Sequence, residues 1–114
     1  MHAKLHGARV TDHNLDYQGS IAIDRALLDA VGILPNERVQ VANKATGARF
    51  ETYAIEAPAG SGSVCVNGAA SRMVNRGDEL LIIAYGVFSA EEAEGHRPKV
   101  AILSRENRVV ELIG

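Results

Sequence analysis

The chain has 114 residues, enough for one compact domain and too few for two, and its 46% hydrophobic and 23% charged residues are ordinary for a water-soluble globular protein. Its 12 Lys and Arg residues are scattered against 14 Asp and Glu, giving a net charge of −2. Nucleic-acid binding requires a concentrated basic face, so this charge pattern argues against that class of function.

Cysteine and histidine usage and the apolar runs exclude further classes. Cys65 is the only cysteine, so no intrachain disulfide can form. The four histidines show no metal-ligand spacing. The N-terminal stretch lacks the apolar core of a signal peptide, and the longest apolar run, 80–84, is too short to span a bilayer. We therefore expect a cytoplasmic protein with no metal site and no membrane partner.

Short β-branched runs separated by turn residues dominate the chain. In chain order, the predicted strands are 8–11, 20–24, 38–42, 49–55, 63–66, 79–87, 100–103 and 109–113. The glycine- and serine-rich stretch 60–63 lacks the Lys-Ser/Thr of a phosphate loop and is interpreted as a flexible hairpin loop.

Two short helices are predicted from their ends. Asp24 can cap a helix over 25–31 that Gly32 terminates. Ser89 and Glu92 form a capping-box pattern at the start of 90–94. Many short strands with few helices indicate a mainly β, single domain over 1–114, built as a small closed barrel or sandwich.

Taken singly, the polar features have plain structural explanations. Gly19-Ser20 is typical of a turn entering a strand, and Asn67-Gly68 of a simple turn. Arg49 and Tyr53, four apart on a strand, share one face and are consistent with an exposed polar stripe. Cys65 lies in a strand-like run, which favours a buried small hydrophobe over a reactive thiol.

Taken together and in order, several segments are far more specific. They are Leu15-Asp16-Tyr17-Gln18-Gly19-Ser20, Gly47-Ala48-Arg49-Phe50-Glu51-Thr52-Tyr53 and Val66-Asn67-Gly68-Ala69-Ala70. This order and spacing closely resemble the bacterial aspartate 1-decarboxylases, a pyruvoyl-dependent family, over nearly the whole chain up to about residue 100. One departure is Ala42, which stands where some family members carry a bulky aromatic residue.

The resemblance implies a six-stranded double-psi β-barrel with short helices that forms a homotetramer, with active sites between neighbouring subunits. The implied reaction removes the α-carboxylate of L-aspartate to give β-alanine for pantothenate synthesis. It uses a pyruvoyl group derived from Ser20, which forms a Schiff base with the substrate amine and accepts electrons from the broken bond. Self-cleavage between Gly19 and Ser20 would give a β chain of residues 1–19 and an α chain of residues 20–114.

The resemblance also assigns roles in self-cleavage. Ser20 attacks the carbonyl of Gly19, whose lack of a side chain would permit strained backbone angles. Thr52 polarises that carbonyl. Asn67 and the backbone amides of Gly68, Ala69 and Ala70 are further candidate donors to the oxyanion, and these small residues would let substrate approach closely.

For turnover, the resemblance implies that Arg49 binds a substrate carboxylate and that Tyr53 donates a proton to the carbanion. Lys4 and His6 are carried over as helpers in the substrate pocket. Tyr17 either lines this pocket or is a packed aromatic near a turn. Strand alternation places Thr52 on the face opposite to Arg49 and Tyr53, so a shared site requires a bulge, strong twist or a subunit boundary.

Other interpretations stay open at this stage. One is a pyruvoyl-dependent decarboxylase with another substrate, although Arg49 favours an acidic one. A second is a non-catalytic double-psi barrel that serves as a binding module and stays uncut. A remote third is a serine hydrolase using Ser20, which lacks recognisable partners. Whether self-cleavage is spontaneous or needs a maturation factor is not decided by the sequence.

Overall fold

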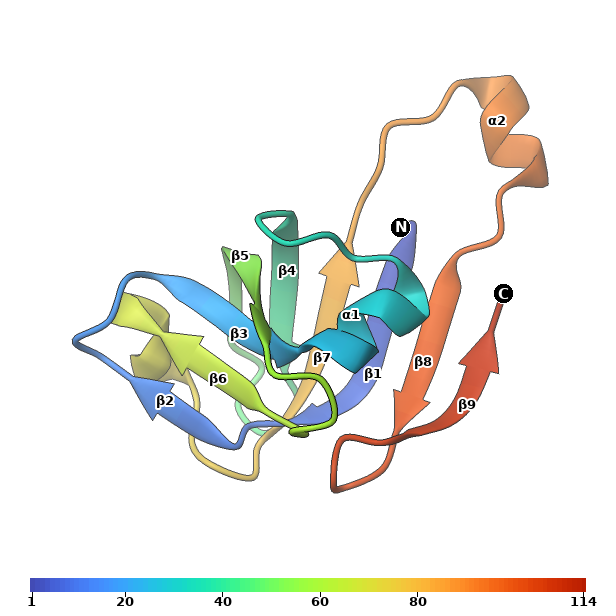
Figure 1. Ribbon diagram of the computed structural model, residues 1–114. Coiled ribbons are helices and arrows are strands. Elements are labelled where there is room, and N and C mark those ends of the chain that lie inside the picture. Colours follow the sequence, from blue (N-terminus) through green and yellow to red (C-terminus); the bar gives the residue numbers. More distant parts are fainter.

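The computed structural model describes residues 1–114 and is mainly β, with two short α-helices and one 3₁₀ helix (Figure 1). The strands are β1 (Ala3–Arg9), β2 (Asp12–Asn14), β3 (Ser20–Asp24), β4 (Arg38–Asn43), β5 (Arg49–Ala57), β6 (Val64–Asn67), β7 (Glu79–Ala84), β8 (Lys99–Leu103) and β9 (Val109–Ile113). The helices are α1 (Arg25–Val31), α2 (Ala90–Gly95) and the 3₁₀ helix η1 (Gly68–Met73).

The strands form one sheet in the order β2-β6-β3-β5-β4-β7-β1-β8-β9. The barrel closes because β1 and β2 belong to one continuous run of chain. Between them, the Val10 amide donates to the Asp78 carbonyl (3.0 Å) and the Thr11 amide donates to the Val64 carbonyl (2.9 Å). The β1–β2 run therefore contacts both β7 and β6, which makes a closed barrel of six strands, with β8 and β9 added along β1.

Alternate residues of the barrel strands fill its interior, as expected for strands buried on one face. The fully buried side chains from these strands are Leu5, Ile21, Ile23, Val39, Val41, Val64, Val66, Leu80 and Ile82. Helix α1 adds Leu27, Leu28 and Val31 to the same core and contacts β1, β3, β5 and β8. Aliphatic side chains thus complete the core without any tryptophan.

Both predicted helices are confirmed together with their ends. The Asp24 carboxylate accepts a hydrogen bond from the Ala26 amide, and Gly32 ends α1 in the left-handed conformation with φ 76°. The capping box of Ser89 and Glu92 is present at the start of α2. These ends were predictable because each depends on hydrogen bonds between residues close in sequence.

The buried Asp24 carboxylate also holds the connection between β5 and β6. It accepts from the amides of Gly60 (2.9 Å) and Gly62 (2.8 Å) as well as from Ala26 (2.8 Å). The prediction of a flexible hairpin over 60–63 was therefore wrong. Strands β5 and β6 do not pair with each other but lie on either side of β3, so this loop crosses over the end of β3.

Asn107 fastens the β8–β9 turn to the point where β1 ends. Its side chain accepts from the Arg9 amide (2.7 Å) and donates to the carbonyls of Arg9 (2.9 Å) and Gly62 (2.8 Å). The residue is 1% exposed and has φ 58°, a left-handed conformation that asparagine tolerates better than most residues. One amide thus ties the barrel seam, the 60–62 loop and the added hairpin together.

The structure corrects the first predicted strand. Residues 8–11 straddle the end of β1, while pairing begins at Ala3 and resumes at Asp12 in β2. A bulge between His6 and Ala8 breaks the alternation of buried and exposed residues that a sequence reading depends on. The predicted strand 79–87 ends at Ala84, after which the chain leaves the barrel and carries α2 away from it (Figure 1). No helix is long and apolar enough to cross a membrane.

A change of pH should test the role of Asp24. Burial by itself raises the pKa of this carboxyl, but hydrogen bonds from the amides of Gly62, Gly60 and Ala26 outweigh burial, so its pKa lies below the usual 3.8. The stabilisation is therefore fully present above about pH 4 and is lost as the pH falls through the pKa of the folded state.

We expect Asp24→Asn to lower the free energy of unfolding by about 1–3 kcal/mol at pH 7. Both carboxylate oxygens of Asp24 accept backbone amides, whereas asparagine has only one accepting oxygen. The stability of Asp24→Asn should also change less than that of wild type between pH 5 and pH 3. Urea unfolding across this range measures both effects. Asp29→Asn, on the exposed side of the same helix, is the control, and equal pH slopes for wild type and Asp24→Asn would contradict the assignment.

Candidate active site

Ser20 is the first residue of β3 and is only 1% exposed. Its hydroxyl donates to the Gln18 carbonyl (3.1 Å) and accepts from the side-chain amide of Asn67 (3.1 Å). Ser20 and Asn67 are directly paired across antiparallel strands β3 and β6, so the sheet itself sets this contact. A buried hydroxyl held on both sides is suited to a reaction within its own chain.

Asn67 is turned toward Ser20 although it stands at the N-cap of η1. Asparagine in that position usually binds the first amides of the helix, yet its side chain makes no capping hydrogen bond here. The first amides of a helix lack partners within it. In η1 these are the amides of Gly68, Ala69 and Ala70, and their role as candidate oxyanion donors stays a prediction.

Gly68 packs directly against the backbone just before Ser20. It has φ +76°, and a Cβ atom built on it would lie 2.6 Å from the Cα and 2.9 Å from the nitrogen of Gly19. No side chain fits there without displacing the Gly19 backbone. Gly68 thus allows a close approach of two backbone segments of the same chain, whereas the predicted close approach of substrate to this segment stays a prediction.

Gly19 itself differs from expectation. Its φ is not in the left-handed region, and a Cβ atom on it would meet nothing within 4 Å. The expected backbone strain at Gly19 is therefore not seen. The glycine that the local geometry requires is Gly68, because close packing between two backbone segments depends on residues distant in sequence.

The parallel pairing of β3 with β5 locates Thr52 and Tyr53. The pairing begins with Ile21 and Ala54, so Ser20 and Tyr53 each lie one residue before the first pair, while Gly19 lies in a bend before β3. Tyr53 points with Ser20 to the outer face of the barrel, whereas Thr52 alternates to the inner face. Thr52 and Tyr53 therefore lie on opposite faces of β5, close to the point where its pairing with β3 begins.

The structure does not bring Lys4 and His6 to Ser20 within one chain. Both project outward from β1, and β7, β4 and β5 lie between β1 and β3. Direct pairing places His6, Leu81, Ala42 and Arg49 in one row across the outer face of four strands. We call this row, together with Lys4, the outer basic face.

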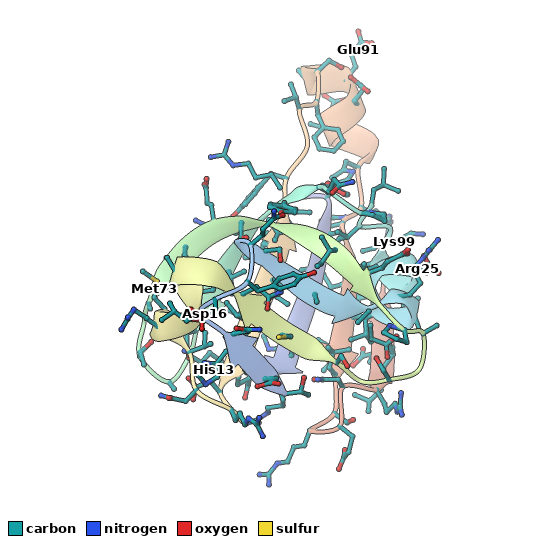
Figure 2. The ribbon with its side chains drawn as sticks, turned by 60° about the vertical axis from the view of Figure 1, so that its left-hand side comes forward. His13, Asp16, Arg25, Met73, Glu91 and Lys99 are labelled. Atoms are coloured by element: carbon teal, nitrogen blue, oxygen red, sulfur yellow. The ribbon has the colours of Figure 1, made fainter.

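Arg49 lies four residues before Tyr53 on β5, about 13 Å away along the strand. Its guanidinium is exposed and makes no ion pair within the chain. Tyr17 is 57% exposed, so it is not a packed aromatic, and its carbonyl lies next to Gly68. Figure 2 shows Asp16, one residue before Tyr17, at the same end of the molecule as Met73 in η1 and far from Glu91 in α2.

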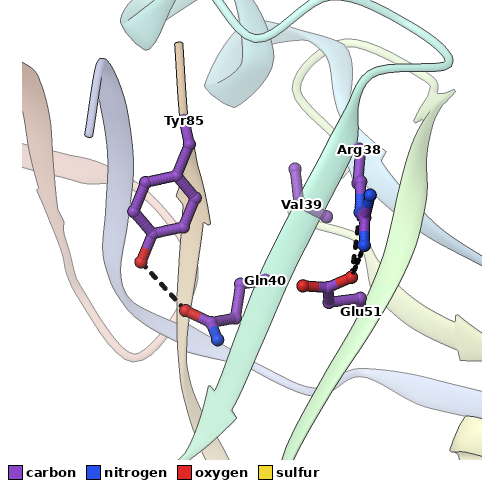
Figure 3. A pocket seen from close by; sticks show the side chains of 5 residues that line it. All are labelled: Arg38, Val39, Gln40, Glu51 and Tyr85. Carbon is purple, nitrogen blue, oxygen red and sulfur yellow. Dashed lines mark hydrogen bonds and ion pairs between the residues drawn. The ribbon is translucent and has the colours of Figure 1, made fainter. Parts of the chain in front are cut away.

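A cavity of about 340 Å³ opens on the outer face of β4 and β5 (Figure 3). It is lined by Arg38, Val39, Gln40, Glu51 and Tyr85. The Tyr85 hydroxyl donates to the Gln40 side chain (2.9 Å), and Arg38 pairs with Glu51. None of the residues predicted for the site lines this cavity. Gln40 and Lys4 are both paired with Ile83 of β7, so only that strand lies between them.

Cys65 is half-buried rather than fully buried as predicted. Burial raises the pKa of its thiol, and the nearby carboxylate of Asp12 raises it further. The thiol is therefore protonated at neutral pH and donates to the Asn67 side-chain oxygen (3.3 Å). The sequence did not predict this contact, because a cysteine and an asparagine two residues apart on a strand form no recognisable motif.

The comparisons first define the class of fold. The crystal structure of a rationally designed protein, mkDPBB_sym_86, matches with a TM-score of 0.54 and 16% identity, covering 71% of this chain and 95% of the designed one. The letters DPBB denote a double-psi β-barrel. Together with the closed six-stranded barrel, this confirms the predicted fold.

The family follows from sequence. The aspartate decarboxylase family model matches residues 1–110. The aspartate 1-decarboxylase of Exiguobacterium sibiricum is 58% identical over 113 residues, which cover 99% of this chain and 89% of the relative. Those of Bacillus subtilis and Halalkalibacterium halodurans are each 53% identical over 114 residues, covering 100% of this chain and 90% of each relative. The chain belongs to the aspartate decarboxylase family.

A matched pair of variants isolates the contact between Gly68 and Gly19. Gly68→Ala and Gly47→Ala both place alanine at φ +76°, but only the former brings a Cβ atom against another backbone segment. We expect Gly68→Ala to displace Gly19. Self-cleavage next to Ser20 should then slow at least tenfold, because the Gly19 carbonyl is no longer aligned with the Ser20 hydroxyl. Gly47→Ala should cleave normally. Denaturing gel electrophoresis over time measures both, and equal rates would contradict the role of Gly68.

Proposed function

We propose that this chain cuts itself between Gly19 and Ser20 and that the resulting enzyme removes the α-carboxylate of L-aspartate, giving β-alanine and CO₂. The observation that carries the proposal is the buried Ser20 hydroxyl, held by Asn67 beside a Gly19 backbone that Gly68 packs against. The relatives named aspartate 1-decarboxylase support the choice of substrate and the assignment as a carboxy-lyase that serves pantothenate synthesis.

The first step of self-cleavage is an acyl shift. The Ser20 oxygen bonds to the Gly19 carbonyl carbon, the peptide C–N bond breaks, and the hydroxyl proton passes to the nitrogen. Loss of the Ser20 Cα proton then breaks the Cβ–O bond and releases the Gly19 carboxylate. Addition of water and loss of ammonia leave a pyruvoyl group at residue 20. The products are chains 1–19 and 20–114, which stay together in one folded domain.

The surroundings of Ser20 suit these steps. The Asn67 amide stabilises negative charge on the Ser20 oxygen as its proton leaves. The Thr52 hydroxyl makes no hydrogen bond elsewhere in the chain, and Thr52 lies two residues before Ala54, the first residue of β5 that pairs with β3, so we assign it to the developing oxyanion. The buried position keeps water from competing with the internal attack.

The surroundings of Ser20 also fit a pyruvoyl group, because the Asn67 side-chain amide offers a hydrogen-bond donor at residue 20. When present there, the group supplies a carbonyl that condenses with the substrate amine. It then accepts the electron pair of the bond that breaks when the carboxylate leaves. Arg49 belongs to the outer basic face and binds a carboxylate of the substrate through its free guanidinium when that face of a neighbouring subunit reaches the site. Tyr53, on the same outer face as Ser20, holds the proton that is returned to the substrate carbon.

Lys4 and His6 can join this site only from another subunit, since three strands separate β1 from β3 within the chain. A homotetramer with sites between subunits brings the outer basic face of one chain toward Ser20 of its neighbour. Exposed apolar side chains on β9 and on the segment carrying α2 support subunit contacts; they are Val87, Phe88, Val109, Val110, Leu112 and Ile113. Whether a maturation factor is required is tested by the purified chain alone.

Intact mass under denaturing conditions tests the proposal directly. The wild type should give two chains split at Gly19–Ser20, the larger lighter by one ammonia than a serine-started chain, and should release CO₂ from L-aspartate but not from L-glutamate. Ser20→Ala should stay one chain and be inactive, whereas Ser63→Ala should behave as wild type. An uncut wild type, even after warm incubation with a bacterial lysate, would contradict self-cleavage and favour a non-catalytic binding module.

Thr52 provides a second test. Thr52→Val keeps the shape of the side chain and removes only the hydroxyl, so self-cleavage should slow by about 10²–10³-fold, the usual effect of losing one oxyanion donor. Thr52→Ser restores the hydroxyl and should recover most of the rate. Following the loss of the uncut chain over time measures this, and normal cleavage of Thr52→Val would remove Thr52 from the mechanism.

A further inference from the structure

We infer that Cys65 is a positioning residue for self-cleavage, which holds the side-chain amide of Asn67 with its N–H directed at the Ser20 hydroxyl. The inference rests on the proposed self-cleavage. It assigns a role to the one cysteine of the chain, which belongs to no cluster of His, Cys, Asp and Glu side chains that could hold a metal and has no second cysteine to pair with.

The contacts form a chain of three hydrogen bonds. The Cys65 thiol donates to Asn67 Oδ1 (3.3 Å), Asn67 Nδ2 donates to Ser20 Oγ (3.1 Å), and Ser20 Oγ donates to the Gln18 carbonyl (3.1 Å). In each of these bonds a hydrogen-bond donor faces an acceptor. Cys65, Asn67 and Ser20 lie on one outer face of β6 and β3, so the sheet fixes their spacing.

The direction of the Asn67 amide matters for the chemistry. With N–H toward Ser20, the amide stabilises the negative charge that forms on the oxygen as it attacks Gly19. With the amide reversed, its carbonyl oxygen would accept the Ser20 hydroxyl proton and stabilise the unreacted serine. Since Asn67 makes no capping hydrogen bond to η1, the Cys65 thiol is the group that distinguishes the two directions.

The surroundings keep the thiol in its donating form. Cys65 pairs with Asp12 across β2 and β6 and with Ala22 across β6 and β3. Burial and the Asp12 carboxylate both raise the pKa of the thiol. A protonated sulfur can donate to Asn67 throughout the neutral range, which a thiolate cannot do.

The experiment compares self-cleavage rates of freshly purified precursor for wild type, Cys65→Ala and Cys65→Ser. Cys65→Ala removes the donor and should cleave about tenfold more slowly, the change expected from losing one hydrogen bond. Cys65→Ser keeps a donor at this position and should stay within about twofold of wild type. Melting temperatures measured alongside show whether all three precursors are equally folded.

A double-variant cycle separates positioning from a packing effect. If Cys65 acts through Asn67, then Cys65→Ala should cause no further slowing in the Asn67→Ala background. A wild-type rate for Cys65→Ala, equal slowing in Cys65→Ser, or full additivity with Asn67→Ala would each overturn the inference. A wild type that is never cut would instead overturn the proposed function, so the two failures are distinguishable.

Discussion

The buried carboxylate of Asp24 is the interaction on which the arrangement of the site depends. It ends β3, caps α1 and accepts the amides of Gly60 and Gly62, so it ties the connection leading into β6 to the end of β3. The register of β6 against β3 begins at this point and runs four residues to the pairing of Ser20 with Asn67. A carboxylate can hold three amides at once because it has two accepting oxygens, and its burial keeps water from replacing them. Displacement of the 60–62 loop would therefore be transmitted along both strands to the cleavage site.

The barrel brings a nucleophile and its target together without a cleft. Ser20 is almost completely covered. In the proposed self-cleavage it attacks the carbonyl before its own nitrogen, so no diffusing substrate would have to reach it. Turnover has the opposite requirement, since L-aspartate must enter. The open elements of the site, Tyr17, Arg49 and Tyr53, lie on the outer side of the barrel, where a neighbouring subunit can complete an enclosed pocket. Burial of the serine and exposure of the binding groups are thus consistent with two successive reactions at one place.

The identities of the site residues could be proposed from the sequence, but not their arrangement. Thr52 illustrates the limit, because strand alternation separated it from Arg49 and Tyr53, and only the parallel pairing of β5 with β3 brings its part of the strand near the start of β3. Gly19 was expected to carry backbone strain, whereas the close approach is made by Gly68, the first residue of η1 and 49 residues further along the chain. Lys4 and His6 lie across the barrel from Ser20, which no local pattern reveals. The hydrogen bond from Cys65 to Asn67 was likewise invisible until both side chains were placed.

The sequence by itself determined the local elements: both α-helices with their caps, most strands, and the mainly β class. It could do so because capping hydrogen bonds and strand preferences act between residues that are neighbours in the chain. The specific order of its motifs also determined the family. Only the tertiary structure decided how the β1–β2 run closes the barrel, how Asp24 captures a loop 36 residues away, and how Asn67 reaches Ser20. These contacts depend on strand register and loop path, which are set by packing of the whole core rather than by any short segment.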